Sequence, residues 1–498
     1  MAVAEAGFLL LSFVLYVLLS SSFKMYKKQS QLPPGPRPWL FLGNLLQKEV
    51  LPLHIHYRKL IEKYGHVFTV WMGSNPVVVL CGYEVNKEAL VEQAEEFGGR
   101  AFIPLNMGRV KGEGMATTND TKWREIRRFT LSTLRNFGMG KRTMSERVQL
   151  EARYLVEEMA ATQGQAFDPT KIITSTVSNV ICSVVFGNRF DYRDQAFLEQ
   201  QHIVAERLRF IRSTSGRIYR LNPKLMDYMP GWHKKTAALG EKMYAFIHEK
   251  VESHRQTLDP QNPRDYIDCF LARFENDQKS TEDILSHEDL VMTVIELFFA
   301  GTSTTSQAVL RSLLAMAKFP NIQAKVQQEI DQVVGANRTP GMEDRMKMPF
   351  TNAVIHEIQR YEETSLEVLP RATTSHTKFK GYIIPQGTSV IPLLSSVHFD
   401  PLQWETPEKF NPGHFLNEKG EFRKRDAFMP FSAGKRACPG EALARMELFL
   451  FFSTLLQNFT FQLAGDTKET DLMSLIANYR QCGVYPPVQA IRRPMCSI

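Results

Sequence analysis

The residues of this chain best suited to chemistry lie between Phe431 and Gly440. Cys438 stands two residues after Arg436 and directly before a long apolar segment. A cysteine just before a helix meets free backbone N–H groups and the positive end of the helix dipole, and both favour a thiolate. Gly434 and Gly440 allow the backbone to approach a flat, bulky group, and Arg436 can meet a carboxylate. Together these features predict a haem held by sulfur on one face.

The apolar segment after Cys438 predicts the helix that this site needs. Pro439 suits a first helical turn, because it lacks the N–H that would have no partner there. Glu441 favours the same turn, and apolar residues continue from Leu443 to Phe452. The alternative is that Cys438 is a buried core cysteine before an ordinary helix, as unpaired cysteines commonly are.

A second candidate site lies within the longest predicted helix, at residues 288–318. This segment is apolar almost all round, so we expect it to run buried through the centre of the domain. In its middle, Gly301 and the hydroxyl residues that follow it make a poor helix interior. A local opening of the helix there could hold dioxygen and a water molecule.

The spacing F-x-x-G-x-R-x-C-x-G at residues 431–440 resembles the haem-binding signature of the cytochrome P450 monooxygenases. The resemblance covers essentially the whole chain, and segments 33–36, 179–192 and 263–268 are similar to the vertebrate microsomal family 2. It implies a mainly α fold with a small β lobe (α+β). It also implies haem b (iron protoporphyrin IX) with Cys438 as its axial thiolate and metal ligand.

Residues 300–305 resemble the oxygen-activation motif of that family, A-G-x-[D/E]-T-T. The resemblance places Ala300 against the haem and makes Thr304 the hydrogen-bond donor and proton guide during oxygen activation. Ser303 occupies the position of the usual acid, which puts the family's acid–alcohol proton route in doubt. Glu296, two turns earlier, is a candidate replacement for that acid. The alternative is that Glu296 has a structural partner.

The resemblance further implies a set of haem contacts. Phe431, Gly434 and Gly440 belong to the signature itself. The candidates for holding the haem propionates are Trp123, Arg127, Arg436, Arg371 and Arg100. For each arginine the alternative is a solvated surface cation.

Glu357, Arg360 and His414 match a structural motif of the family. An exposed Glu–Arg pair three residues apart stabilises a helix very little. The resemblance instead implies a buried ion pair with His414 as third member, which would stabilise the fold around the haem and take no part in catalysis.

The implied function is a monooxygenase that inserts one oxygen atom of O2 into lipophilic small molecules, namely xenobiotics, fatty acids or steroids. An apolar pocket is expected for such substrates. The candidate pocket residues are Phe102, Phe210, Phe298, Val368 and Ile476. Two alternatives remain: a haem-thiolate isomerase or lyase acting on a peroxide, and a non-enzymatic haem-binding protein.

Electrons must come from outside, because the chain shows no convincing nucleotide-phosphate loop. The resemblance implies NADPH acting through a flavoprotein reductase, with cytochrome b5 as a second candidate partner. Basic residues are expected on the cysteine side, where they would attract an acidic protein. They are Lys122, Arg124, Arg128, Arg135, Lys141, Arg142, Lys424, Arg425, Lys435 and Arg445. The alternative is ordinary solubility charge.

The N-terminus predicts a membrane anchor. Residues 6–23 carry no charge, near the length of about 20 residues that spans a bilayer, and Lys24, Lys27 and Lys28 follow. The positive-inside rule then places the bulk of the chain in the cytosol. We therefore expect an uncleaved transmembrane signal-anchor at 1–28, a proline-rich hinge at 29–40 and a catalytic domain at 41–498, on the endoplasmic reticulum membrane.

Composition narrows the partners and the compartment. The net charge of +7 suits an acidic partner or anionic lipid and does not demand nucleic acid. The six cysteines form no C-x-x-C pair, which fits a reducing compartment, and Cys81 and Cys182 are expected in the core. The sequons at Asn119, Asn337 and Asn458 should carry no glycan if the domain is cytosolic.

Periodicity predicts the elements that position these residues. A hairpin is expected over residues 67–80, and short strands near 377–384, 389–394 and the C-terminus. The predicted helices cover residues 83–96, 121–135, 143–162, 170–186, 235–256, 287–317, 321–334 and 349–361. A helix-rich body with a small sheet lobe on the N-terminal side follows.

Overall fold

The fold is described from a computed structural model of the 498-residue chain. It describes residues 31–101, 113–220, 222–277, 285–361, 369–465, 470–482 and 485–494. The predicted anchor lies outside these ranges. Within them, no helix combines the length and the apolar character that crossing a membrane requires.

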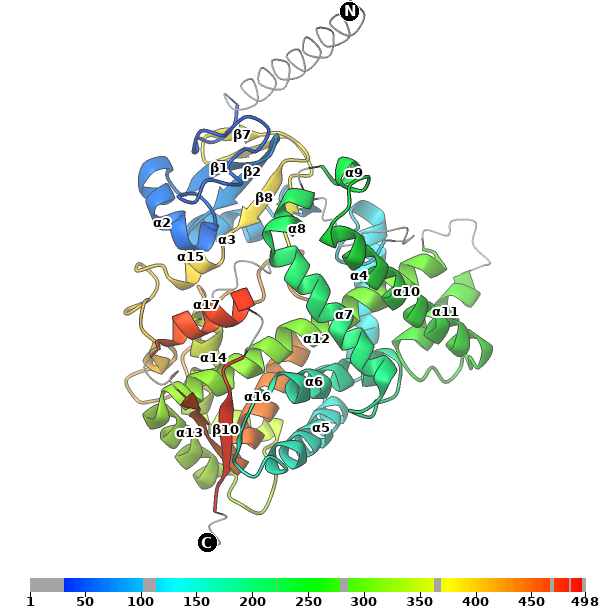
Figure 1. Ribbon diagram of the computed structural model, residues 1–498, viewed down its shortest axis with the longest axis vertical. Coiled ribbons are helices and arrows are strands. Elements are labelled where there is room, and N and C mark those ends of the chain that lie inside the picture. The colour runs from blue at the N-terminus through cyan, green and yellow to red at the C-terminus, as the bar shows by residue number, and fades with distance from the viewer. Residues whose placement is uncertain are drawn as a thin grey trace, which may run out of the picture.

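Helices form most of the described chain (Figure 1). The α-helices are α2 Leu53–Tyr64, α3 Tyr83–Lys87, α4 Asp120–Asn136, α5 Arg142–Ala160, α6 Thr170–Val185, α7 Gln195–Arg212, α8 Thr214–Tyr219, α9 Pro223–Met226, α10 Trp232–Gln256, α11 Tyr266–Asp277, α12 His287–Lys318, α13 Pro320–Val333, α14 Pro349–Tyr361, α15 Ser395–His398, α16 Glu441–Asn458 and α17 Leu472–Cys482. Shorter turns are the π-helix η1 Glu88–Glu92 and the 3-10 helices η2 Met342–Lys347 and η4 Pro412–Phe415.

The strands form small sheets, and the largest lies at the N-terminal end of the molecule (Figure 1). It has the order β1-β2-β8-β5-β3, in which only β2 and β8 pair in parallel. A second sheet has the order β4-β10-β9, and β6 pairs with β7. The bounds are β1 Val67–Met72, β2 Asn75–Leu80, β3 Gly99–Arg100, β4 Ala166–Phe167, β5 Arg371–Ala372, β6 Thr377–Phe379, β7 Tyr382–Ile384, β8 Ser389–Pro392, β9 Phe459–Leu463 and β10 Val488–Arg492.

Helix α12 runs through the middle of the helical body, in contact with α6, α7, α10, α14 and α16 (Figure 1). It begins at a capping box, in which Ser286 Oγ accepts from the Asp289 N–H and Asp289 Oδ2 accepts from the Ser286 N–H. The helix continues without interruption through the glycine and hydroxyl residues in its middle. The predicted local opening is therefore not a break in the helix. A Cβ on Gly301 would lie 2.9 Å from the Ile181 side chain, so the glycine allows α6 to pack closely.

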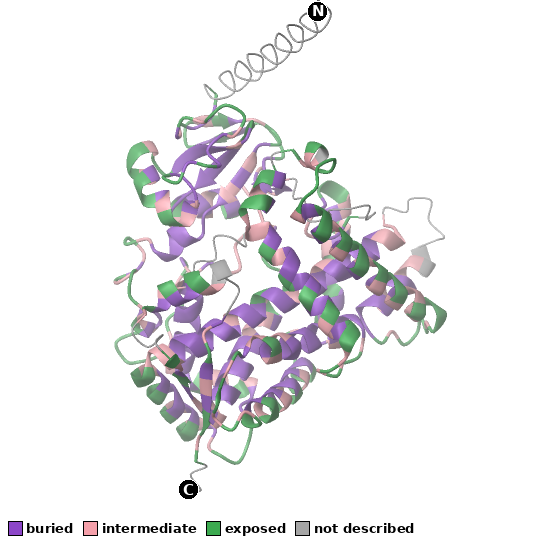
Figure 2. Cartoon of the chain, in the orientation of Figure 1, coloured by how far each residue is buried: buried purple, intermediate pink, exposed green. Residues whose placement is uncertain are grey.

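Burial follows this arrangement, with buried residues along the central helices and exposed ones at the periphery (Figure 2). One large core lies among α5, α6, α12, α13, α14 and α16, and another among α6, α7, α10, α11 and α12. Cys81 and Cys182 are fully buried, as the sequence predicted. The expected α+β architecture is confirmed.

The proline-rich segment is non-helical over residues 33–38, as predicted, but it does not stand free of the domain. The Thr69 N–H donates to Pro34 O at 2.9 Å, which attaches the segment to β1. A Cβ on Gly35 would lie 1.9 Å from Thr69 O, so only glycine permits this contact. The proline-rich segment is thus in direct contact with β1.

Candidate active site

The segment around Cys438 forms a tight loop before α16. The Cys438 N–H donates to Phe431 O at 2.9 Å, which closes the loop. Gly434 has a φ of 71°, and a Cβ there would lie 1.7 Å from Leu90 O, so its glycine allows approach to the protein backbone. A Cβ on Gly440 would lie 4.0 Å from Cys438 Sγ. Since α16 begins at Glu441, with Gly440 as its N-cap, Cys438 does lie just before a helix.

Part of the surface of Cys438 is accessible. Other protein atoms nevertheless surround the residue, and this burial is the largest influence on the pKa of its thiol. Cys438 is therefore accessible at a place that other protein atoms closely surround. Burial raises the pKa of the thiol, and the Gly440 N–H and the nearby Arg127 lower it only in part. The sequence predicted that the helix terminus would favour a thiolate. Burial favours the neutral thiol and is the larger of the two effects. Binding to a metal would have to displace the proton.

An accessible stripe runs along one face of the otherwise buried helix α12. Ala300 and Thr304 are exposed, and Glu296 and Ala308 are half-buried, at successive i, i+4 positions. Their neighbours Leu297 and Phe298 on the same helix are buried. Thr304 Oγ1 donates to Ala300 O at 2.9 Å, and Ser303 beside it is buried. The stripe presents the Thr304 hydroxyl between Ala300 and Ala308, with the Glu296 carboxylate one turn before Ala300.

The arginines predicted to bind propionates form one cluster. The register of β3 and β5 pairs Arg100 with Arg371 across the two strands. Arg436 lies with its guanidinium 3.8 Å above the Trp123 ring, and Arg127 from α4 donates to Ala437 O at 2.7 Å, next to Cys438. We call Arg100, Arg127, Arg371 and Arg436 the arginine cluster. Within the described ranges, none of the four pairs with a carboxylate.

The arginine cluster is electrostatically strained. Burial, with the neighbouring arginine charges, lowers the pKa of Arg436 to about 8 and that of Arg371 to about 9. Burial also lowers the pKa of Arg100 to about 10, although Glu296 acts in the opposite direction. A bound dianion would relieve this repulsion.

Two polar groups beside the cluster have no partner among the described residues. They are Nη1 of Arg436 and the indole Nε1 of Trp123, and both are buried. A buried donor without an acceptor is unfavourable, which indicates that an acceptor belongs here. Propionate carboxylates supply such acceptors, so the donors present fit a haem whose iron meets Cys438.

Glu296 is held by the segment that precedes α4. Its Oε2 accepts from the Ala116 N–H at 2.7 Å, and its Oε1 accepts from Thr117 Oγ1 at 3.0 Å. Burial raises the pKa of Glu296 to about 7, against the lowering effect of these donors and of Arg100. Both of its oxygens are therefore engaged, as the structural alternative expects, and a role as proton source stays a prediction.

Glu357, Arg360 and His414 meet in a fully buried network. Arg360 Nη2 and Nε donate to the two Glu357 oxygens at 2.7 Å each, and His414 Nδ1 lies 3.2 Å from Glu357 Oε2. The remaining Arg360 donors reach the carbonyls of His398, Pro407 and Lys409. All five N–H groups of this arginine are satisfied, so the predicted ion pair is a structural one.

The predicted substrate-pocket residues are not gathered at one place in the described structure. Phe210 packs with Tyr219 and Trp232, Phe298 belongs to the core between α10 and α12, and Ile476 belongs to the core around α16. Phe102 and Val368 lie outside the described residues. The pocket therefore stays a prediction.

Two residues at the site were not among the predicted ones. Asn119 Oδ1 accepts from the Arg100 backbone N–H at 2.7 Å and from Arg436 Nη2 at 3.1 Å, so it joins two members of the arginine cluster. Glu447 is buried in α16, which raises its pKa to about 8 against a hydrogen bond from Thr305. A carboxylate inside an apolar segment was a readable signal for Glu447. Asn119 offered no such signal.

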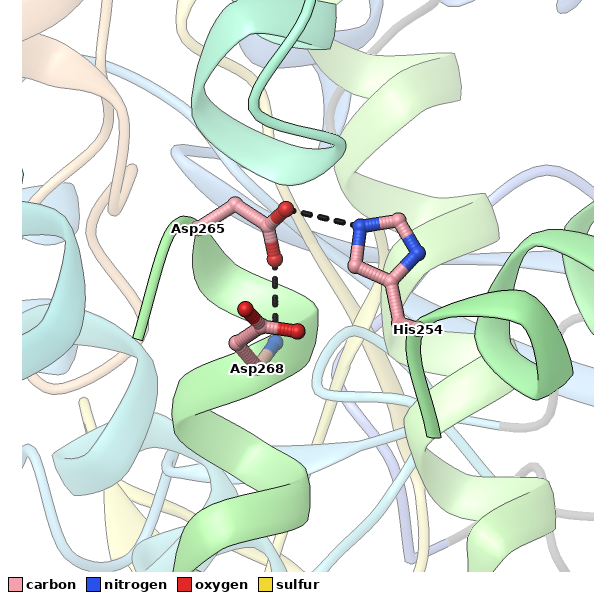
Figure 3. Close-up of side chains that lie close together, drawn as sticks. All are labelled: His254, Asp265 and Asp268. Carbon is pink, nitrogen blue, oxygen red and sulfur yellow. Dashed lines mark hydrogen bonds and ion pairs between the residues drawn. The ribbon is translucent and has the colours of Figure 1, made fainter. Parts of the chain in front are cut away.

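A second group of titratable residues joins the end of α10 to the start of α11 (Figure 3). His254, Asp265 and Asp268 offer ligand atoms within 4.8 Å of one another. However, His254 Nδ1 faces Lys250 O at 2.7 Å and its Nε2 faces Asp265 Oδ2 at 2.7 Å. Both ring nitrogens thus meet acceptors and must donate, which leaves no lone pair for a metal. Asp268 in turn accepts from Arg264. The group is a structural ion-pair network.

This network predicts a pH-dependent contribution to stability. Burial lowers the pKa of His254, but Asp265 and the Lys250 carbonyl raise it by more, so the net pKa is raised above 6.5. The stabilisation is fully present below the unfolded-state pKa of about 6.5 and is lost as the pH rises through the folded-state pKa. The urea midpoint of the wild-type protein should therefore fall between pH 6 and pH 8 in part because this contribution is lost. We expect a smaller fall in His254→Gln, which lacks the titrating group. The exposed His248→Gln on the same helix should leave the difference unchanged; an equal loss in both variants would contradict the assignment.

Comparisons with known proteins agree with the geometry. The family model described as cytochrome P450 matches residues 33–480. Cytochrome P450 2C14 of Oryctolagus cuniculus is 47% identical over 94% of this chain and 95% of its own length. Cytochrome P450 2B4 of the same organism is 46% identical over 97% of this chain and 98% of its own length. Cytochrome P450 2C8 of Homo sapiens is 46% identical over 94% of this chain and 97% of its own length.

Proposed function

Because the chain belongs to the cytochrome P450 family and is a haem-thiolate monooxygenase, we propose that it oxidises lipophilic small molecules with electrons from an NADPH-dependent flavoprotein reductase. The substrate classes are xenobiotics, fatty acids or steroids. One observation carries the proposal: the accessible Cys438 lies beside the arginine cluster, where the buried donors Arg436 Nη1 and Trp123 Nε1 have no acceptor among the described residues. When bound, the haem supplies the activation of dioxygen, and an axial thiolate favours O–O cleavage.

The residues of the chain have separate tasks in this proposal. The arginine cluster and Trp123 would hold the propionates, and Cys438 would bind the iron. The Thr304 hydroxyl, which donates to Ala300 O, can turn to hold a proton at Oγ1 toward the accessible side of the stripe. Ser303, in place of an acid, lacks a titratable carboxyl group, so we expect proton delivery to be less efficient. The buried Leu297 and Phe298 beside the stripe support an apolar substrate.

The basic residues on the cysteine side support a docking surface for an acidic reductase. Helix α4 contacts the Cys438 loop through Arg127 and exposes Arg124, Arg128 and Arg135 to solvent. Exposed charges of one sign speed the encounter with a partner of the opposite charge. Cytochrome b5 is a second candidate for the same surface.

Exposed apolar residues support a location on the endoplasmic reticulum membrane, with the catalytic domain on its cytosolic face. Trp39, Leu40 and Phe41 follow the proline-rich segment, and Leu225, Tyr228 and Met229 lie in and after α9. The sheet lobe and α9 lie at the same end of the molecule (Figure 1). Apolar side chains at that end would enter the bilayer surface next to the predicted anchor.

Reductase-driven turnover tests the proposed function. The protein in lipid vesicles with NADPH, reductase and a panel of lipophilic compounds should form oxygenated products, and omission of reductase should abolish them. Thr304→Ala should lower product per NADPH about tenfold or more, because positioned proton transfer typically contributes about 10²–10⁴-fold. Ser303→Glu should raise it. Rearrangement of a lipid peroxide without NADPH or reductase, with no oxygenation in their presence, would instead establish an isomerase or lyase.

A further inference from the structure

Two carboxylates on α12 hold the segment of residues 113–119, which we call the clasp segment. Asp289 Oδ1 accepts from the Glu113 N–H at 2.9 Å, and Glu296 Oε2 accepts from the Ala116 N–H at 2.7 Å. Asp289 and Glu296 are seven residues apart, so they lie on one face of the helix. Thr117 Oγ1 donates to Glu296 Oε1, which is the third hydrogen bond between the segment and α12. The clasp segment is therefore attached to α12 at two points.

The clasp segment also holds the arginine cluster. Arg100 Nε donates to Ala116 O at 2.9 Å, and Arg436 Nη2 donates to Thr118 O at 2.7 Å. Asn119, at the end of the segment, bonds to both arginines. The peptide groups at Ala116 thus lie between the Glu296 carboxylate on one side and the Arg100 guanidinium on the other.

The close approach of the clasp segment to Glu296 requires Gly114. A Cβ at that position would lie 2.2 Å from Glu296 Oε2 and 2.3 Å from its carboxyl carbon. A side chain at residue 114 would therefore push the Glu296 carboxylate out of the position that it holds. The clasp segment and the Glu296 carboxylate thus pack closely against each other. A polar side chain without a positioning role would not need so close a fit.

We propose that Glu296 is a positioning residue, whose hydrogen bonds to the clasp segment hold Arg100 and Arg436 in place to retain the haem. The inference deepens the proposed function and rests on it, since it assigns this half-buried carboxylate to cofactor retention. It also links α12, which carries Thr304, to the propionate end of the site. A displaced clasp segment would move the carbonyls that orient both guanidinium groups.

The test compares haem retention with the opening of the clasp segment in the holoprotein. We would measure the rate of haem transfer to excess apomyoglobin, and amide hydrogen exchange of a peptide covering 113–119. Glu296→Ala should speed haem loss about 10- to 100-fold, as loss of an outer partner typically does. It should also speed exchange of the Ala116 amide. Gly114→Ala should do the same from the other side of the contact.

Glu296→Gln keeps an oxygen that can accept from the Ala116 N–H, and the Thr117 hydroxyl can turn to accept from its amide. It should therefore stay close to the wild type in both measurements. Two control variants on α12 are Glu288→Ala, in the first turn, and Val309→Ala, which removes buried core volume. Val309→Ala should lower the urea midpoint without selective exchange at 113–119.

Three results would overturn the inference. They are unchanged haem loss and exchange in Glu296→Ala, a Glu296→Gln variant as impaired as Glu296→Ala, or equal acceleration of haem loss by Val309→Ala at a matched urea midpoint. Neither haem transfer nor amide exchange depends on NADPH or substrate. Failure of reductase-driven turnover would therefore count against the proposed function without contradicting the role of Glu296 in haem retention.

Discussion

A Cys438→Ser variant is expected to lose the thiolate-type, red-shifted Soret band of the reduced, carbon monoxide-bound protein. The accessible Cys438 follows Ala437, whose carbonyl accepts from Arg127 of the arginine cluster, so a haem held by that cluster would have Cys438 within reach as its ligand. A serine hydroxyl does not replace a thiolate as axial ligand or supply its electron density. Loss of an outer partner of a ligand typically costs about 10- to 100-fold, so loss of the ligand itself should cost more than about 100-fold in turnover.

The matched control for this prediction is Cys269→Ser. Cys269 is half-buried in α11, where burial raises the pKa of its thiol to about 11, and it takes no part in the site. This variant should keep the wild-type spectrum. A histidine-type band in the wild-type protein, or an unchanged band in Cys438→Ser, would show that another residue binds the iron.

The sequence predicted the helices well where periodicity was strong. Residues 170–186 were expected to form a helix, and they form α6 Thr170–Val185. The apolar side chains of α6 are buried against apolar residues of α5 and α12. Short strands were expected near 377–384, and β6 and β7 lie there on either side of a turn. Lys380 and Gly381 there adopt positive φ values of 48° and 84°, which a continuous strand excludes.

The site was predictable where one short segment carries it, and unpredictable where distant segments meet. Phe431, Gly434 and Cys438 stand within eight residues of each other, so their relation could be read from spacing. The pairing of Arg100 with Arg371 depends on the register of two strands far apart in the chain. No local pattern specifies that register.

The same reasoning explains why Glu296 was ambiguous in the sequence. Its i−8 relation to Thr304 suggested a proton source, because a helix aligns such residues on one face. Its partners, Ala116 and Thr117, come from a segment whose approach depends on Gly114 and on the fold as a whole. The hydrogen bonds of Glu296 to these two residues are tertiary contacts, which sequence spacing does not report.

The largest effect on folding is expected from Arg360→Ala. This change leaves the Glu357 carboxylate buried, with its two arginine contacts removed, and three backbone carbonyls without their donor. Removing one partner of a buried ion pair typically costs about 3–5 kcal/mol, a large share of a total stability of about 5–15 kcal/mol. We expect little soluble, haem-loaded protein, as measured by the yield of the carbon monoxide-bound species per mole of purified chain.

A pair with the same spacing on the surface provides the control for Arg360→Ala. Glu252 and Arg255 are also three residues apart, but both are exposed and their charged atoms are 3.8 Å apart. Arg255→Ala should change the free energy of unfolding by less than about 0.5 kcal/mol and leave the haem yield unchanged. If Arg360→Ala folded and bound haem as well as Arg255→Ala, burial of the pair would not stabilise the fold. Arg360→Lys should also fail to fold, because a lysine has one charged nitrogen for acceptors that the guanidinium reaches with three.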